Sequence, residues 1–471
     1  MTRKILYGIS TVLISIILAA PAPAAAAGMT LSEAVSYAIA HSPALERQRA
    51  AVAQASAQYV KARGQQYPNV VGTLQNQVLR SANATGGFAQ FGLSQQNRFS
   101  QNTAQLGTNY TLFNGGLNQI TAQQSRQQYE AAKDDLRRLD AQTTTDTTAA
   151  FFNVAAKGES ARLAESDLAY QRALLDAATA KERAGLAAGV DTLRAQVNVK
   201  RSQASLANAR SDEQNAREAL AQIIGAPLDT PFAVPNRLAE PPLPQQSVES
   251  LIAIAEANRP DLASARASAQ VARLSRAGLF AEFFPSIQLA GAFGNQTSPT
   301  AFQLQQAQLD GFCRQTPGCL KAPTVVRGTP GFWQIQATTA LNLPLIDYGA
   351  RSAAHQAANE QVVSADANLD AVRRTVEGDV RQGLRNAQTA AATIAFQHDA
   401  ARLGAESARI AQLQYQNGLI SLTDTVAAQN TALSSELDLY NARVTYLTAL
   451  VKLRMALGTY DPAASVADMV Q

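Results

Sequence analysis

One stretch of this chain recurs, with small changes, 233 positions further along. Residues 183–186 read Arg-Ala-Gly-Leu and are followed by Asp191, while residues 416–419 read Gln-Asn-Gly-Leu and are followed by Asp424. An internal period of this length is typical of repeated structural units, each of which buries its apolar face against its neighbour. The chain is therefore expected to fold as two copies of one unit.

Motifs nearer the start of each copy repeat at a shorter offset of 217. Ser-Pro-Ala-Leu at residues 42–45 matches Arg-Pro-Asp-Leu at residues 259–262, so the second copy carries a 16-residue insertion further on, between Pro285 and Gly349. A proline-rich strip separates the copies. We expect a signal peptide at 1–27, a first repeat at 28–225, the proline-rich linker at 226–246, a second repeat at 247–458 and a tail at 459–471.

The first residues have the pattern of a cleavable export signal. Arg3 and Lys4 precede an apolar run over residues 5–20 and an alanine-rich tract, and such a segment is removed rather than folded. Cleavage is expected near Ala26 or Ala27. Beyond it, no stretch approaches the ~18 apolar residues that a membrane-spanning helix needs. Any insertion into a membrane must therefore use strands.

Charge and cysteine content exclude several classes of protein. The net charge of +4 is small, and it is scattered, with no basic patch that would bind nucleic acid. Cys313 and Cys319 lie close together in the insertion, and in an exported protein such a pair is expected to form a disulfide. The 3 histidines are far apart in the sequence. Neither a metal nor a cofactor is therefore expected.

Between the helical segments of each copy the pattern changes to alternation. In the second copy, Trp333, Ile335 and Leu341 alternate with Gln334 and Gln336. Any half-buried sheet gives the same alternation. However, the predicted strands are ~10 residues long, aromatic residues gather at their ends and long hydrophilic loops join them, as in transmembrane strands. Each copy is predicted to contain two strands. If these four strands span a membrane, other chains must complete the sheet, because open edges are not viable in lipid.

Two segments, 118–183 and 350–416, contain no proline and carry charged residues throughout. As helices they would extend on the order of 100 Å, about three times the thickness of a bilayer core. In the segment that follows the second of them, Leu439, Tyr446 and Leu453 recur at seven-residue spacing. This spacing predicts coiled-coil packing.

A shorter helix is expected at the start of each copy. Thr30 and Glu33 form a capping-box pattern, which predicts the start of a helix that runs to about Gly64. Its counterpart in the second copy is predicted over about 247–282, with an interruption near Pro260.

Several motifs recur in a fixed order: Met-Thr-Leu-Ser-Glu-Ala at 29–34, Leu-Phe-Asn-Gly-Gly at 112–116, Leu-Ile-Asp-Tyr-Gly at 345–349 and the two Gly-Leu turns. Together they resemble the TolC family of outer-membrane efflux proteins, over essentially the whole mature chain. The resemblance implies an α+β membrane protein that forms a homotrimer. Each protomer would give four transmembrane β-strands to a shared twelve-stranded barrel in the outer membrane, and long α-helices to a coiled-coil periplasmic tunnel.

The resemblance also implies the partners of such a duct. A periplasmic adaptor and an inner-membrane pump would deliver the substrate, and the duct would conduct it passively to the exterior without any chemistry of its own. The turns at Gly185-Leu186 and Gly418-Leu419 would be the tips that meet the adaptor. A glycine in a tight turn between antiparallel helices is also expected on conformational grounds alone.

Three further residues correspond to the narrow periplasmic entrance of the family. Asp191 and Asp424 lie six residues beyond the two tip glycines, and Tyr415 matches a position whose hydroxyl helps to hold the closed entrance against the aspartate of the first copy. An aspartate near a helix start is also a common capping residue. The chain departs from some members at Ile420, where they have arginine, and at Ala427, where they have aspartate.

Two other classes of function compete with an export duct. A trimeric coiled-coil adhesin would share the alanine-rich heptads, but would have no need of a duplicated four-part unit. An enzyme is disfavoured, because the chain has no glycine-rich phosphate loop, no cluster of histidines and carboxylates and no nucleophile motif. The residues do not identify the substrate or the class of pump, since selectivity in such systems lies mainly in the pump.

Overall fold

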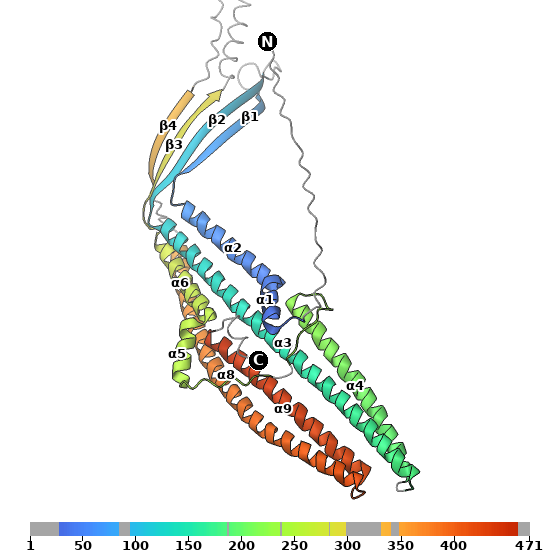
Figure 1. Ribbon diagram of the computed structural model, residues 1–471. Coiled ribbons are helices and arrows are strands. Elements are labelled where there is room, and N and C mark those ends of the chain that lie inside the picture. Colours follow the sequence, from blue (N-terminus) through green and yellow to red (C-terminus); the bar gives the residue numbers. More distant parts are fainter. Residues whose placement is uncertain are drawn as a thin grey trace, which may run out of the picture.

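The computed structural model describes residues 28–83, 95–185, 188–235, 238–281, 283–297, 331–340 and 348–459. The molecule is elongated, with a curved sheet at one end and two long helical hairpins extending away from it (Figure 1). Among the helices in these ranges, none combines the length and the apolar composition of a membrane-spanning helix. The predicted signal peptide, Leu186, Cys313, Cys319 and nearly all of the tail lie outside the described residues.

The helices of the two copies match in length. The first copy contains α1 (Leu31–His41), α2 (Pro43–Gly64), α3 (Leu117–Arg183) and α4 (Gly189–Ile224). The second contains α5 (Val248–Asn258), α6 (Pro260–Ala281), α8 (Ala350–Gln416) and α9 (Leu422–Leu457). In both copies the lengths are 11, 22, 67 and 36 residues. The first two helices repeat at an offset of 217 and the last two at 233, as the sequence motifs do.

The prediction of one continuous helix from residue 31 to Gly64 was wrong. The capping box of Thr30 and Glu33 is present, but α1 ends at His41 and α2 begins at Pro43. Between them Ser42 is extended, with φ −64° and ψ 121°. The residue before a proline is driven out of the helical region by a clash with the proline ring, so the chain must turn here. The interruption predicted near Pro260 is confirmed, and Arg259 has nearly the same backbone angles.

The sheet contains four antiparallel strands in the order β1-β2-β3-β4. Their bounds are β1 Asn69–Asn83, β2 Gln95–Asn114, β3 Ser286–Thr297 and β4 Gly331–Ala340. Each copy contributes two neighbouring strands, and the two copies meet at the pairing of β2 with β3. Among the described strands, β1 and β4 pair on one side only.

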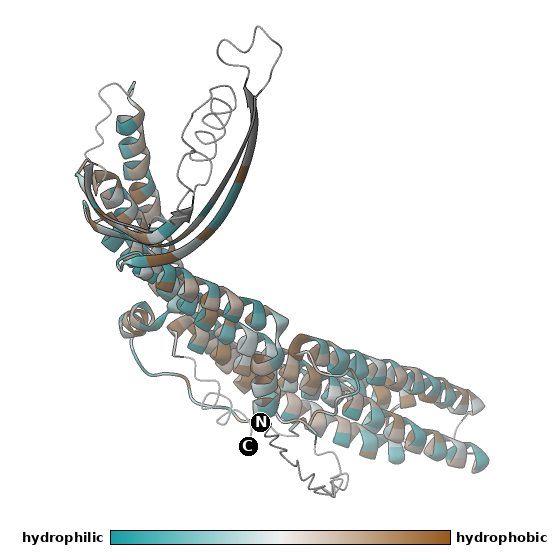
Figure 2. Ribbon diagram, turned by 90° about the horizontal axis from the view of Figure 1, so that it is seen from above, coloured by the Kyte–Doolittle hydropathy of each residue, from teal (hydrophilic) through white to brown (hydrophobic). Residues whose placement is uncertain are grey.

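The two faces of this sheet differ in polarity. One register row of the first face crosses the strands at Gly72, Leu106, Phe293 and Trp333. The side chains on this face are exposed in the single chain, with Trp333 at 76% and Ile335 at 74%. A row of the other face crosses at Asn69, Asn109, Ala290 and Gln336. Hydrophobic residues are accordingly visible along the curved sheet in Figure 2, where no other described element covers them.

The main hydrophobic core lies among the helices, where the short helices α1 and α5 pack against the long ones. Phe151 and Phe152 of α3 are fully buried in it, and replacing a buried phenylalanine by alanine costs about 3–5 kcal/mol. The predicted heptad on α9 is confirmed. Tyr446 and Leu453 are buried in this core, and Leu439 is partly buried against it.

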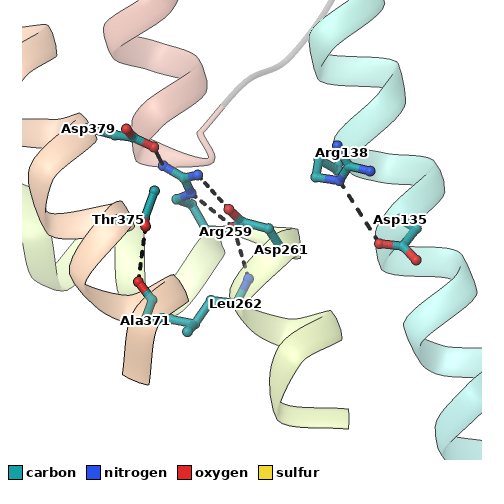
Figure 3. Close-up of polar contacts among 8 residues, drawn as sticks. All are labelled: Asp135, Arg138, Arg259, Asp261, Leu262, Ala371, Thr375 and Asp379. Atoms are coloured by element: carbon teal, nitrogen blue, oxygen red, sulfur yellow. Dashed lines mark hydrogen bonds and ion pairs between the residues drawn. The ribbon is translucent and has the colours of Figure 1, made fainter. Parts of the chain in front are cut away.

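A largely buried arginine lies at the break between α5 and α6. The Arg259 side chain is only 13% exposed. It donates to both carboxylate oxygens of Asp261, at 2.9 and 2.5 Å, and to Oδ2 of Asp379 on α8, at 2.7 Å. Figure 3 shows this guanidinium between the two carboxylates, with Arg138 and Asp135 paired separately on α3. The bond to Asp379 therefore connects the break between α5 and α6 to α8.

Candidate functional site

The hairpins α3–α4 and α8–α9 both turn at the end of the molecule farthest from the sheet (Figure 1). Gly185 and Gly418 lie in these turns with φ of +70° and +74°, a conformation in which a side chain clashes with the backbone. A Cβ atom built on either glycine would meet no atom of the described residues within 4 Å, its own chain neighbours aside. Within the chain, therefore, the backbone conformation requires glycine and packing does not.

The second tip ends α8 with a Schellman motif. The Gly418 amide donates to the Tyr415 carbonyl at 3.0 Å, and the Leu419 amide donates to the Gln414 carbonyl at 2.8 Å. These two bonds satisfy carbonyls that the end of a helix leaves unpaired. The Leu419 side chain is left 72% exposed, so this tip presents an apolar side chain to the solvent.

The helices that follow the two tips, α4 and α9, begin differently. Ser421 caps α9: its hydroxyl accepts from the Asp424 amide at 3.2 Å and donates to Asp424 Oδ2 at 2.7 Å. The matching residue of the first copy, Ala188, has no hydroxyl and makes no side-chain cap. There, Glu182 accepts a hydrogen bond from the Thr192 hydroxyl. Asp424 thus takes part in the capping of α9, as its position near the start of the predicted helix suggested.

Tyr415 is buried where the two hairpins meet. Tyr415 is buried in a small apolar cluster, here called the tip cluster, to which four helices contribute: Leu174, Ala178, Ala195, Tyr415 and Leu422. Burial raises the pKa of the Tyr415 hydroxyl, and the negative charge of Asp191 raises it further. Asp191 itself lies 3.8 Å from Arg194 on the same helix. Of the three predicted entrance residues, Tyr415 is buried between the hairpins within the electrostatic reach of Asp191, whereas Asp424 is held by its own helix start.

Lys181 also belongs to this region, although no motif in the sequence indicated it. The Lys181 ammonium donates to the Tyr415 carbonyl and lies 4.1 Å from the centroid of the Tyr415 ring. A comparison of the repeats offers a signal, because Lys181-Glu182 occupies the place of Gln414-Tyr415 in the second copy. Ile420 is partly buried against the tip cluster.

The model of a family described as outer membrane efflux protein matches residues 34–226 and 251–459. Protein CyaE of Bordetella pertussis is 22% identical over 367 residues, which cover 78% of this chain and 70% of that protein. Outer membrane protein TolC of Escherichia coli is 25% identical over 321 residues, which cover 67% of this chain and 61% of TolC. The matched region is thus less than two thirds of TolC.

Solved structures share the fold over most of their length. The outer membrane channel CmeC of Campylobacter jejuni superposes with a TM-score of 0.72 at 16% identity, covering 93% of this chain and 88% of CmeC. The MtrE outer membrane channel of Neisseria gonorrhoeae, in its open state, superposes with a TM-score of 0.69 at 21% identity, covering 91% and 88%. The alternative of a surface adhesin finds no support in these comparisons.

Proposed function

The chain belongs to the outer membrane efflux protein family, a family of channels, and on that premise we propose how it conducts its substrates. It is an outer-membrane channel with a helical region in the periplasm. In our proposal three copies form one passive duct. Each copy gives its four strands to a shared twelve-stranded barrel and its two hairpins to a coiled-coil tunnel in the periplasm.

The exposed apolar face of the sheet carries this proposal. Trp333, Ile335 and Phe293 are each at least 69% exposed in the single chain. Soluble proteins rarely expose a contiguous apolar patch to water, and such patches mark contacts with protein or membrane. Lipid would accept it, provided that the outer edges of β1 and β4 are paired, because unpaired backbone groups cost several kcal/mol each in hydrocarbon. Pairing β4 of one copy with β1 of the next closes the sheet.

The polar face then lines the inside of the barrel. A barrel of about eight strands has an interior that its own side chains fill, and larger barrels leave an open channel. Gln336 and Asn109 lie on the face that would surround this channel. A water-filled passage lined by uncharged polar groups suits a duct that conducts many kinds of substrate.

At the other end, the tips are suited to a protein partner. We place the adaptor contacts at Gly185, Leu186, Gly418 and Leu419, and an inner-membrane pump beyond the adaptor. An exposed leucine such as Leu419 contributes apolar area to an interface at little cost to the free chain. In the same proposal Asp191, Tyr415 and Asp424 surround the entrance between the tips.

Recordings from the purified protein test this function. Protein extracted from the outer membrane should insert into a planar lipid bilayer and produce discrete, uniform conductance steps, and its mass in detergent should be that of three mature chains. A protein that inserts but conducts no ions, or that has the mass of a single chain, contradicts the proposal.

A further inference from the structure

Arginine and aromatic side chains gather where α6 and α8 join the sheet. The rings of Phe280 on α6 and His355 on α8 lie 4.6 Å apart, and Phe283, in the turn before β3, stacks on the same His355 ring at 5.5 Å. The Arg351 guanidinium lies 5.0 Å from the centroid of the Phe283 ring. Arg276 precedes Phe280 by one helical turn, so both lie on one face of α6. These five residues are here called the junction cluster.

The junction cluster is open to its surroundings. Phe280 is 55% and Phe283 42% exposed, and Arg276 is exposed and makes no ion pair with another described residue. The packing of α6 against α3 uses a different side of the helix. A Cβ atom built on Gly278, two positions before Phe280, would meet the Leu117 side chain of α3 at 3.6 Å. The face that carries Arg276 and Phe280 is therefore left for another partner.

The helix ends that adjoin the sheet are basic. In the two turns of α2, α3, α6 and α8 nearest the sheet, every charged residue is a lysine or an arginine: Lys61, Arg63, Arg276 and Arg351. Two acidic residues of the connections, Glu282 and Asp347, lie outside the described residues. A cluster of like charges attracts ligands of opposite sign. The partner of this region is therefore expected to be anionic.

The position of the junction cluster indicates which anion this is. The helical region lies in the periplasm, and α6 ends beneath the curved sheet (Figure 1), so the cluster adjoins the periplasmic leaflet of the outer membrane. At 1.5 Å per residue, Arg276 and Arg351 lie within about 8 Å of the helix ends next to the sheet. The headgroup region of one leaflet is roughly 5–8 Å thick, and aromatic side chains favour the same level. The cluster therefore lies at the level of the lipid headgroups.

We propose that the junction cluster binds an anionic phospholipid of the periplasmic leaflet. Arg276 and Arg351 pair with the headgroup phosphate, because a guanidinium stacked on an aromatic ring still presents N–H groups at its edge, where phosphate binds bidentately. Phe280 and Phe283 contact the first carbons of the acyl chains, which continue over the apolar face of the sheet. This inference depends on the insertion of the sheet in the proposed function, and it adds a lipid ligand to it.

Native mass spectrometry of the full-length, delipidated protein in detergent tests the site. Phosphatidylglycerol is compared with phosphatidylcholine, and inorganic phosphate is added as a competitor. One double variant, Arg276→Gln with Arg351→Gln, removes both charges, and a second, Arg276→Lys with Arg351→Lys, keeps them. The matched control is Arg402→Gln with Arg409→Gln, because these arginines are 66% and 60% exposed on α8 and pair within their own helix.

The wild type should bind phosphatidylglycerol about tenfold more tightly than phosphatidylcholine, and the glutamine variant should lose roughly ten- to thirty-fold in affinity for phosphatidylglycerol, as expected for two arginines at an anionic headgroup. The lysine variant should keep most of the affinity and the control all of it. Excess phosphate should not displace the lipid.

Three results would overturn the lipid site: equal affinity of the wild type for the two lipids, equal affinity of the glutamine variant and the control for phosphatidylglycerol, or displacement of the lipid by phosphate, which would make this a site for free anions. The comparison of the two lipids on the wild type decides the matter even where the glutamine variant does not assemble. Bound lipid is read as added mass, independently of conductance. A wild type that conducts no ions but prefers phosphatidylglycerol therefore contradicts the proposed function and leaves the lipid site in place.

Discussion

The guanidinium of Arg259 lies 2.7 Å from Oδ2 of Asp379, and this ion pair joins the break before α6 to the long helix α8. Because Arg259 is largely buried and also binds Asp261, its removal leaves two carboxylates without their common partner.

We expect Arg259→Met to lower the stability of the folded protein by about 2 kcal/mol, the cost of losing hydrogen bonds to charged groups. The midpoint temperature of thermal dissociation in detergent should fall accordingly. Arg402→Met is the control, since Arg402 is 66% exposed and lies 3.7 Å from Asp399 on its own helix, and such surface pairs contribute little. Equal effects of the two substitutions would mean that the Arg259 cluster does not stabilise the break.

The faces of the sheet can be tested with two adjacent residues of β4. Ile335 lies on the apolar face and Gln336 on the polar face. Ile335→Arg should cost roughly 2–4 kcal/mol near the bilayer midplane and sharply reduce the amount of assembled protein in outer-membrane fractions, whereas Gln336→Arg should assemble normally. Similar yields of the two variants would show that the apolar face does not contact lipid.

The tip can be tested without disturbing its turn. Leu419→Ser removes an exposed apolar side chain and leaves Gly418 and its positive φ intact. Export by intact cells should fall sharply, while the yield of assembled protein stays at the wild-type level. Leu228→Ser is the control, because Leu228 is 58% exposed in the linker, far from the tips. Normal export by Leu419→Ser would place the adaptor contact elsewhere.

The charge of Asp424 can be separated from its role at the start of α9. Asp424→Asn keeps an oxygen that can accept from the Ser421 hydroxyl, but removes one negative charge from each protomer. Three such carboxylates around the entrance should bind multivalent cations, so block of the channel by a trivalent cation applied from the periplasmic side should weaken. Asp399→Asn, on an exposed part of α8, should leave the block unchanged. If a trivalent cation blocks Asp424→Asn as strongly as the wild type, Asp424 does not bind cations at the entrance and acts only at the start of α9.

The long elements could be predicted from the sequence because their signals are local. The proline-free segments predicted at 118–183 and 350–416 agree with the bounds of α3 and α8 to within a residue, and alternation at Trp333 and Ile335 identified the apolar face of the sheet. The break at Ser42 was missed although the equivalent break at Pro260 was predicted. A proline is tolerated in the first turn of a helix and not in its interior, so Pro43 marks the start of a second helix.

The contact between Lys181 and Tyr415 could not be predicted in the same way. It joins residues on different hairpins, and no periodicity in either segment reports which helices lie side by side. The cap of α9, by contrast, depends on residues three positions apart: the Ser421 hydroxyl accepts from the Asp424 amide and donates to its carboxylate, and the Ser-x-x-Asp spacing resembles a capping box.

The central claim is that the polar face of the sheet lines a water-filled duct, and thiol block of single channels tests it most directly. In a chain whose Cys313 and Cys319 are replaced by serine, Gln336→Cys and Ile335→Cys are compared before and after addition of a charged, membrane-impermeant thiol reagent. We predict a stepwise fall in conductance for Gln336→Cys and no change for Ile335→Cys. Block of Ile335→Cys alone, or of neither variant, would contradict the account.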